Sequence, residues 1–561
     1  MALFWMDSRG VFGEIAKVNG RFWAWAILLS SLILLAWRIG FEDPALLEDD
    51  DRSSSKIKLR HRAPPSVKRA IEKMPSWEPS EDFLDALLDE SFRIRDIVVR
   101  FPDDDSLKTF VAAAAERGLR VEDKLAKLRM LRVRLASGRQ ARELFELLPD
   151  DSVPEPNYPV IAPDIPQTEN VRGIAPFGAA AVDWLDAPGD RSNWGAGVRV
   201  AILDTGVDFS HPALEGVQGT SVNLVEDETD ETSYDGHGTA VASIIAGNPE
   251  VIGGLAPKAE ILSIRVLNSE GVGDGYTVAS GIIEAVDRGA DVINLSLGTP
   301  GNSFVLEEAI EYAQQNNVLV VASVGNDGVE GITYPARYDG VIGVTAIDAK
   351  GTQASFSNYG VGVDIGAPGT GVHAAWSEEG LVSFSGTSAS TPFVAGALAG
   401  LISENRGLPR ERLPELLYTH ANDDVMPGED AYVGKGILDL GRVVGRNDKG
   451  TYDVAITGYY FDPDDFDTEG DTPFLVSIQN QGTEWIDRAT LEIEYGEVSK
   501  TLRFANLGVG EVKSQELQLA AKNAKDPDGT RIISQLSLDN HEDADTDNNQ
   551  RVTRITLPGE E

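Results

Sequence analysis

The stretch SFSGTSASTPFVAGALAG, residues 383–400, decides the fold of this 561-residue chain. A Gly-Thr-Ser turn leads into a run of small and apolar residues that has no polar face after Pro392. A helix that is apolar all round is buried, so this stretch predicts a helix at the centre of a large domain. Ser388 stands at the start of that helix, where a serine is most often only a cap.

Apolar runs and helical patterns alternate on both sides of this helix, between residues 174 and 445. Such βαβα alternation predicts an α/β domain with a mainly parallel sheet and helices on both faces. Catalytic groups in such a domain belong at the carboxyl ends of the strands. The expected strands are 198–203, 260–267, 291–297, 318–323 and 341–347, and the expected helices are 237–247, 276–288, 305–316 and the stretch after Thr387.

The composition of the chain outside this domain indicates a linker and two further domains. Residues 42–90 are charged and contain proline, which is typical of a linker. Residues 91–165 predict a small α+β domain, with strands at 94–101 and 127–135 and helices at 106–118 and 138–148. Residues 451–558 predict a β-sandwich, because seven short strands alternate with turns. Those strands are expected at 453–461, 473–480, 489–495, 500–504, 514–519, 531–538 and 551–556.

An uncharged segment, FWAWAILLSSLILLAW at residues 22–37, lies near the N-terminus between Arg21 and Arg38. Its length is compatible with a membrane anchor and with a signal peptide. No small-residue cleavage site follows it and tryptophans lie near both ends, so residues 22–41 are interpreted as an uncleaved anchor. Acidic residues follow the segment, and we therefore expect residues 1–21 in the cytoplasm and the remainder outside.

The charge of the chain is strongly negative, with 90 acidic residues against 49 lysines and arginines and a formal net charge of -41. Such a polyanion repels nucleic acid, so nucleic acid is not expected as a partner. The absence of cysteine excludes disulfides, thiolate metal sites and cysteine nucleophiles. One segment has the opposite sign: residues 93–142 carry a net +6, whereas residues 174–445 carry -25.

Three side chains have the chemistry of a nucleophilic site. Asp204 follows an apolar strand in VAILDTGVD, His237 begins a helix in DGHGTAVASIIAG, and Ser388 begins the buried helix. Each has an ordinary structural interpretation by itself, as a turn residue, an incidental histidine or a cap. Together they match a serine activated by an imidazole that a carboxylate orients, in one of the known chain orders for this constellation.

The segments Asp204-Thr-Gly, His237-Gly-Thr and Gly386-Thr-Ser388 resemble the three signature segments of the subtilisin-like serine proteases, or subtilases. The resemblance implies that Ser388 is the nucleophile, His237 its base and Asp204 the orienting carboxylate. Asn326 in VVASVGNDG matches the family's oxyanion asparagine, whose amide stabilises the tetrahedral intermediate. The motifs are correctly ordered, which makes the match specific.

The resemblance also places substrate-binding segments, which hold a peptide as an added strand. Two rails are implied, and their glycines let a peptide backbone approach closely. A permissive pocket is implied beside them. The residues are Gly271, Val272, Gly273, Ser296, Leu297 and Gly298 for the rails, and Ser323, Thr333 and Ala336 for the pocket.

This chain departs from the family pattern at two places. Ala389 stands where a methionine usually follows the nucleophile, which predicts tolerance to peroxide. Ala213 follows His211-Pro212 where an aspartate commonly contributes to a calcium site, so that site is doubtful. Clustered oxygens at 226–235 or 462–471 offer alternative places for calcium, although solvated acidic loops explain them better. No cofactor is expected for catalysis, and a structural calcium ion is not required.

By the same resemblance, residues 91–165 correspond to an inhibitory prodomain whose tail crosses the cleft and is cut between Val160 and Gly173. Residues 451–558 resemble adhesion-related, CARDB-like immunoglobulin domains. The expected protein is a serine endopeptidase acting on proteins or peptides, made as a self-processing zymogen outside the cytoplasm, anchored or secreted. An inactive scaffold used for adhesion and a narrowly specific processing peptidase are the alternatives.

Overall fold

The computed structural model describes residues 96–163, 165–166, 175–225, 236–376, 380–423, 426–461, 471–520 and 530–555. The expected anchor at 22–41 and the whole linker at 42–90 therefore lie outside the described residues. Within the described parts, residues up to Asn157 form one compact unit and residues from Tyr158 onward form a second. No described helix is both long and apolar enough to cross a membrane.

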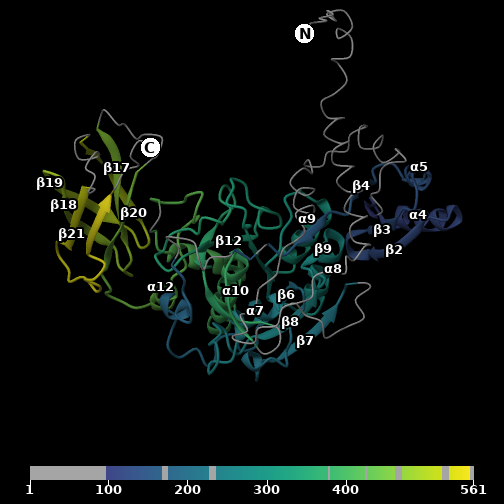
Figure 1. Ribbon diagram of the computed structural model, residues 1–561, viewed down its shortest axis with the longest axis horizontal. Helices are drawn as coiled ribbons and strands as arrows, with labels where there is room; N and C mark the ends of the chain where they lie inside the picture. Colours follow the sequence, from purple (N-terminus) through teal and green to yellow (C-terminus); the bar gives the residue numbers. More distant parts are fainter. Residues whose placement is uncertain are drawn as a thin grey trace, which may run out of the picture. The chain divides into compact units, whose positions relative to one another are not determined.

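The first unit is an antiparallel sheet with two helices on one face (Figure 1). Alternate residues of β1, such as Ile97 and Val99, pack with Phe110 of α4 and Leu144 of α5. Asp103 caps α4 by accepting hydrogen bonds from the backbone of residues 105 and 106. The elements are β1 (Asp96–Arg100), α4 (Asp104–Arg117), β2 (Arg120–Leu125), β3 (Met130–Arg134), α5 (Gly138–Leu147) and β4 (Val153–Pro156). The sheet order is β2-β3-β1-β4.

The second unit is built on a seven-stranded parallel sheet in the order β13-β12-β11-β10-β6-β8-β7. This is the predicted parallel α/β architecture. The central strands are mainly apolar because both faces are covered, and β12 is buried at every position. The strands are β6 (Arg199–Asp204), β7 (Gly219–Asn223), β8 (Glu260–Arg265), β10 (Val292–Leu295), β11 (Leu319–Ser323), β12 (Ile342–Ile347) and β13 (Ile365–Pro368).

Helices cover both faces of this sheet, as Figure 1 lets the reader trace. Val200 and Ile202 of β6 lie in one core with residues of α7 and α10. Leu203 points to the opposite face, where it lies against Gly281 of α8. The main helices are α7 (His237–Ala246), α8 (Gly275–Asp287), α9 (Phe304–Gln315) and α10 (Thr387–Glu404).

Smaller elements complete this unit. Two short pairs of strands, β5 with β9 and β14 with β15, lie beside the main sheet. The bounds are β5 (Pro159–Ile161), α6 (Ala181–Trp184), β9 (Val272–Asp274), β14 (Val372–Ala375), β15 (Leu381–Phe384), α11 (Leu413–Thr419) and α12 (Leu440–Gly445).

Helix α10 is the centre of the core, as its sequence predicts. All of its residues from Thr387 to Leu401 are buried. It packs against α7 and against strands β10 to β13. Gly400 has no room for a side chain, because an added Cβ would lie 2.3 Å from the ring of Trp194. The small residues of the quoted stretch therefore let neighbouring groups approach closely.

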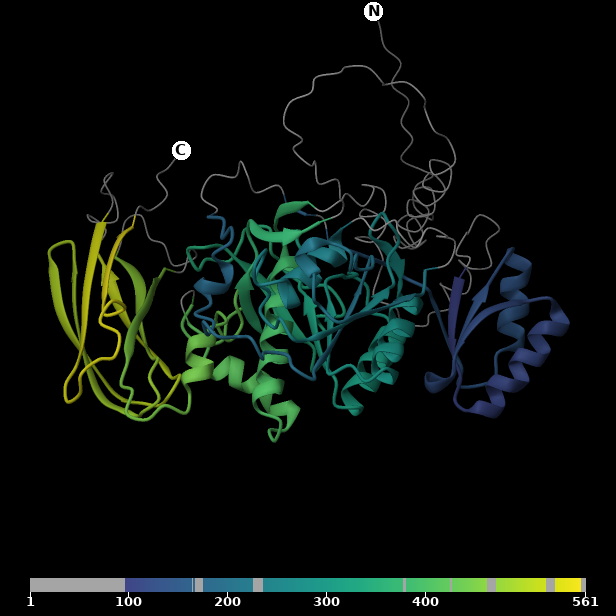
Figure 2. The ribbon, with the colours of Figure 1, turned by 90° about the horizontal axis from the view of Figure 1, so that it is seen from below.

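The C-terminal part is a two-layered β structure, whose adjacent layers Figure 2 shows in olive to yellow. One sheet has the order β16-β17-β20 and the other β19-β18-β21-β22. Alternate residues of both sheets face one core, for example Val476 and Leu491. The strands are β16 (Val454–Tyr460), β17 (Thr472–Asn480), β18 (Ile486–Tyr495), β19 (Val498–Leu507), β20 (Val512–Leu519), β21 (Thr530–Leu538) and β22 (Gln550–Ile555).

Candidate active site

Asp204 and His237 meet at the carboxyl end of β6. Asp204 is the last residue of that strand and His237 the first of α7, and both side chains are fully buried. The Nδ1 atom of His237 lies 2.9 Å from both carboxylate oxygens of Asp204, and the Thr205 amide donates to Oδ1 at 2.7 Å. A carboxylate at Nδ1 places the proton there, so Nε2 is the nitrogen that can act as a base.

Two glycines allow this approach. Gly236, just before the helix, has φ 100°, a conformation that favours glycine. Gly238 passes so close to the loop after β6 that an added Cβ would lie 2.2 Å from the carbonyl oxygen of Gly206. The Asp-Thr-Gly and His-Gly-Thr motifs are therefore spatial partners as well as sequence signatures.

Ser388 is the second residue of α10 and is 1% exposed. Gly386 turns the chain into the helix with φ 129°. The Ser388 hydroxyl donates to the carbonyl oxygen of Ser296 at 3.4 Å, and the Ser296 hydroxyl donates to the carbonyl of Ser388 at 3.1 Å. The positive end of the α10 dipole lies at this serine, which favours negative charge on its oxygen.

Asn326 is held by the loop that carries the nucleophile. Its Oδ1 accepts hydrogen bonds from the backbone N–H and from the hydroxyl of Thr387, both at 2.9 Å. Its Nδ2 faces Gly386, where an added Cβ would lie 2.7 Å away. Sequence reasoning missed the role of Thr387, although the residue lies inside the Gly-Thr-Ser motif. The feature of the sequence that could have indicated this role is that Thr387 places a second hydroxyl group directly before Ser388.

The two predicted rails flank a strand from the chain itself. Val160 of β5 is opposite Gly273 of β9, and the amide of Ala162 donates to the carbonyl of Gly271 at 2.9 Å. On the other side, Ile161 and Gly298 exchange hydrogen bonds of 3.0 and 2.8 Å. Within the segment Tyr158–Pro166, residues 159–162 thus lie between the two rails as an added strand.

The other predicted substrate-binding residues lie behind these rails. Leu297 is fully buried, and its carbonyl accepts the hydroxyl of Ser323 at 3.4 Å. Thr333 donates through its hydroxyl to the carbonyl of Ser323 at 3.3 Å and lies close to Gly298. Ala336 is 1% exposed. The structure therefore brings Ser323 and Thr333 to the rail, while Ala336 lies in the core nearby.

Two aromatic side chains that sequence reasoning did not single out pack against His237. The ring of Phe384 meets the imidazole edge-on with centroids 5.4 Å apart, and Trp376 does so at 6.4 Å. Both residues are buried, so they shield the Asp204–His237 pair from water. An aromatic residue just before the Gly-Thr-Ser motif was the available signal for Phe384.

No group of three or more His, Cys, Asp or Glu residues in the described ranges is arranged to hold a metal ion. The acidic loop at 226–235 and nearly all of 462–471, which were alternative places for calcium, lie outside those ranges. Subtilase catalysis needs no cofactor.

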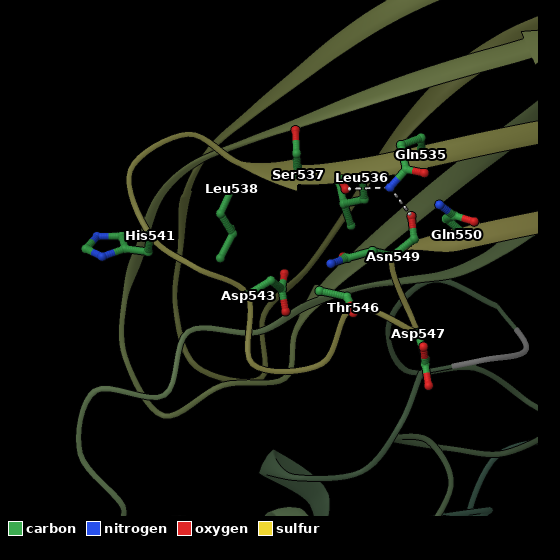
Figure 3. Close-up of a pocket in the computed structure, with 10 residues that line it drawn as sticks. All are labelled: Gln535, Leu536, Ser537, Leu538, His541, Asp543, Thr546, Asp547, Asn549 and Gln550. Atoms are coloured by element: carbon green, nitrogen blue, oxygen red, sulfur yellow. Dashed lines mark hydrogen bonds between the residues drawn. The ribbon is translucent and has the colours of Figure 1, made fainter.

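A separate pocket of about 500 Å³ lies in the sandwich, between β21 and the loop that precedes β22 (Figure 3). Its wall includes His541, Asp543 and Asn549, and burial raises the pKa of Asp543. The pocket contains none of the predicted catalytic residues. Beside the predicted catalytic residues, the two rails are instead paired with residues 159–162 of the chain itself.

Comparisons with known proteins match the central part of this chain. Residues 195–436 match the model of the Subtilase family. Subtilisin DY from Bacillus licheniformis is 38% identical over 47% of this chain and 97% of its own length. Thermitase from Thermoactinomyces vulgaris is 38% identical over 45% of this chain and 89% of its own length. Among solved structures, the protease domain of PatA aligns with 35% identity and a TM-score of 0.42, covering 45% of this chain and 96% of that chain.

Proposed function

The chain belongs to the subtilase family and is a subtilisin-like serine endopeptidase, and from this premise we propose that Asp204, His237 and Ser388 form its catalytic triad. The single observation that carries the assignment is the fully buried Asp204–His237 pair, with both carboxylate oxygens 2.9 Å from Nδ1. A buried carboxylate in this position stabilises the imidazolium that forms when His237 takes a proton.

The proposed reaction follows from the roles of these atoms. The Ser388 oxygen attacks the carbonyl carbon of the scissile peptide bond while His237 Nε2 takes the hydroxyl proton. The amide of Asn326 and the backbone N–H of Ser388 stabilise the oxyanion. The carbon–nitrogen bond then breaks, the amine leaves with the proton from His237, and water hydrolyses the acyl-enzyme by the same steps.

We further propose that the enzyme is made as a zymogen, with residues 91–165 as its inhibitor and 174–445 as the catalytic domain. The antiparallel pairing of Val160 and Ile161 with the rails supports this proposal. Opposite net charges of +6 and -25 on residues 93–142 and 174–445 favour association of the two parts.

The N-terminal segment and the sandwich complete the proposal. Residues 22–41 would anchor the enzyme in a membrane with residues 1–21 inside, or would direct secretion, and the catalytic domain would act outside the cytoplasm. Residues 451–558, similar in sequence to adhesion-related immunoglobulin-like domains, would bring the enzyme to a protein surface. Its substrates would be proteins and peptides bound along the two rails.

The test compares the full-length wild type with Ser388→Ala. The wild type should react with a fluorophosphonate at Ser388 and separate into an N-terminal piece and a catalytic piece that keeps the sandwich. Ser388→Ala should fold, remain unlabelled and stay intact, because removing the nucleophile of subtilisin costs about a millionfold in rate.

Intact mass and peptide mapping provide the measurement, with proteases excluded during purification. A Ser388→Ala preparation that matured by itself would contradict self-processing. Cleavage of that variant by a trace of mature wild type would show that processing between molecules also occurs, and it would leave the triad assignment unchanged.

A further inference from the structure

The strand that pairs with the two rails has a proline, Pro163, two residues after Ile161. Along one rail, Ile161 and Gly298 exchange two hydrogen bonds, of 3.0 and 2.8 Å. In an antiparallel ladder the next such pair lies two residues further along one strand and two residues back along the other. That pair is Pro163 and Ser296.

Proline has no backbone N–H, so Pro163 cannot donate to the carbonyl of Ser296. On the other side of the strand, the amide of Ala162 does donate to Gly271 at 2.9 Å. The strand is therefore hydrogen-bonded to both rails up to Ala162. At the next residue, Pro163, the hydrogen bond to the carbonyl of Ser296 is missing.

The carbonyl oxygen of Ser296 instead accepts the hydroxyl of Ser388, at 3.4 Å. The nucleophile thus donates to the acceptor that an ordinary residue at position 163 would fill. A hydroxyl that donates to a backbone carbonyl does not donate its proton to the base. Because the ladder puts residue 163 opposite Ser296, this contact implies that position 163 lies beside Ser388.

The segment continues past the turn at Gly386 that precedes α10. Pro166 lies beside Gly386, where its Cδ would be 3.5 Å from an added Cβ. Ile165 is 7% exposed and belongs to the core cluster that contains residues of α7 and α10. The chain is therefore held on both sides of the bond between residues 163 and 164.

We infer that Pro163 makes the segment Tyr158–Pro166 a resident inhibitor of the groove that resists cleavage after residue 163. This inference rests on the proposed triad. It identifies Pro163 as the residue that protects the 163–164 bond from the chain's own active site. The bond that self-processing cuts is then a bond other than 163–164.

The test replaces Pro163 by alanine in the full-length chain. Alanine restores the N–H, which can donate to Ser296 and release the Ser388 hydroxyl to His237. Ser388 should then attack the carbonyl carbon of residue 163, the 163–164 bond should break, and the amine of Asp164 should take the proton through His237. Water completes the hydrolysis of the ester.

The expected result is an N-terminal fragment that ends at residue 163, at least about tenfold more abundant than in wild type, since a backbone hydrogen bond contributes roughly that factor. Intact mass of both fragments measures it. Pro249→Ala is the matched control, because it makes the same change at an exposed proline outside the groove segment, and it should behave as wild type. The double variant Pro163→Ala with Ser388→Ala should produce no such fragment.

Two outcomes would overturn the inference. One is a wild-type chain cut after Pro163 as readily as the variant. The other is a Pro163→Ala chain that reacts with the fluorophosphonate but is not cut after residue 163. Pro163→Leu, which restores the same N–H with a larger side chain, replaces the alanine variant if the latter does not fold. A chain that is neither labelled nor cut anywhere would contradict the proposed function itself.

Discussion

Single residues in this site act through the groups that hold them. Asn326, the proposed oxyanion donor, is a clear example, because both of its Oδ1 hydrogen bonds come from Thr387, the residue before the proposed nucleophile. With Oδ1 fixed in this way, Nδ2 is directed to the side of the loop where Ser388 begins its helix. The donor and the nucleophile are therefore positioned by one turn of chain.

Asn326→Ala should lower kcat by about a hundredfold to a thousandfold and leave KM nearly unchanged, because the lost donor acts mainly on the transition state. This magnitude is the one measured for the corresponding donor of subtilisin. Asn326→Asp should be equally slow, since it keeps the acceptor and loses the donor. Steady-state kinetics on a peptide substrate provide the measurement.

Thr387→Val is the positioning control for that prediction. It removes the hydroxyl bond to Asn326 and keeps the backbone one, so it should lower kcat by about tenfold only. If Asn326→Ala retained most of the wild-type kcat while the protein still reacted at Ser388, the oxyanion role of Asn326 would be wrong.

At the scale of elements, the start of β16 is hydrogen-bonded to the loop that precedes β22 in the sandwich. Asp453, just before β16, accepts a hydrogen bond from Asn548 at 2.9 Å. Burial, followed by the charges of Asp543 and Asp545, raises the pKa of Asp453 from 3.8 to about 6. The first strand of the sandwich thus depends on a carboxyl group that holds its proton more tightly in the folded state.

The sign of the pH effect follows from that direction. A raised pKa means that the stabilising contribution of Asp453 is complete below its unfolded pKa of 3.8 and is lost as the pH rises through about 6. The unfolding free energy of wild type, relative to that of Asp453→Asn, should therefore fall by on the order of 2 kcal/mol between about pH 4 and pH 7.

Denaturant titrations at several pH values, with hydrogen exchange of the sandwich amides, measure this difference. Asp487→Asn, at an exposed position of β18, is the matched control and should track wild type at every pH. A difference between wild type and Asp453→Asn that stayed constant over the window would contradict the prediction.

For the molecule as a whole, one side chain joins the sandwich to the catalytic part of the second unit. Arg442 of α12 donates to the carbonyl of Ala421 at 2.8 Å and to the carbonyls of Asn480 and Gln481 at 3.4 and 3.3 Å. Gln479 of β17 also donates to Ala421, at 3.0 Å. The planar guanidinium of Arg442 has enough N–H groups to donate to the three carbonyls at once.

Arg442→Ala should destabilise this junction by about 2 to 3 kcal/mol, because buried carbonyls lose charged donors. We expect a single thermal transition in wild type and two in the variant, with faster proteolysis between α12 and β16. Calorimetry and limited proteolysis provide the measurement. Arg446→Ala is the control, since Arg446 donates to Val443 and Asn405 within the catalytic part.

Arg442→Lys separates charge from geometry, because an ammonium cannot reproduce the planar fork, and it should be nearly as destabilising as alanine. Unchanged thermal and proteolytic behaviour in both Arg442 variants would show that the sandwich is held by other contacts.

The sequence by itself determined the architecture around the nucleophile. The buried helix after Gly386, the parallel strands that follow an unbroken apolar pattern, and the seven C-terminal strands were all predicted from periodicity within a few residues of their bounds. The family followed from three short motifs. The strands β2, β4, β5, β7, β9, β13, β14 and β15 were not predicted: β2 and β7 are exposed over much of their length, and the other six have only three or four residues each, so their apolar patterns are weak.

Only the tertiary structure decided which of these residues meet. The hold of Thr387 on Asn326, the packing of Phe384 on His237 and the pairing of Ile161 with Gly298 are contacts between segments far apart in the chain. Periodicity reports which side of an element is buried, but it does not report register between segments. A shift of one residue would reverse which backbone groups face each rail, so the role of Pro163 depends on a register that the fold alone sets.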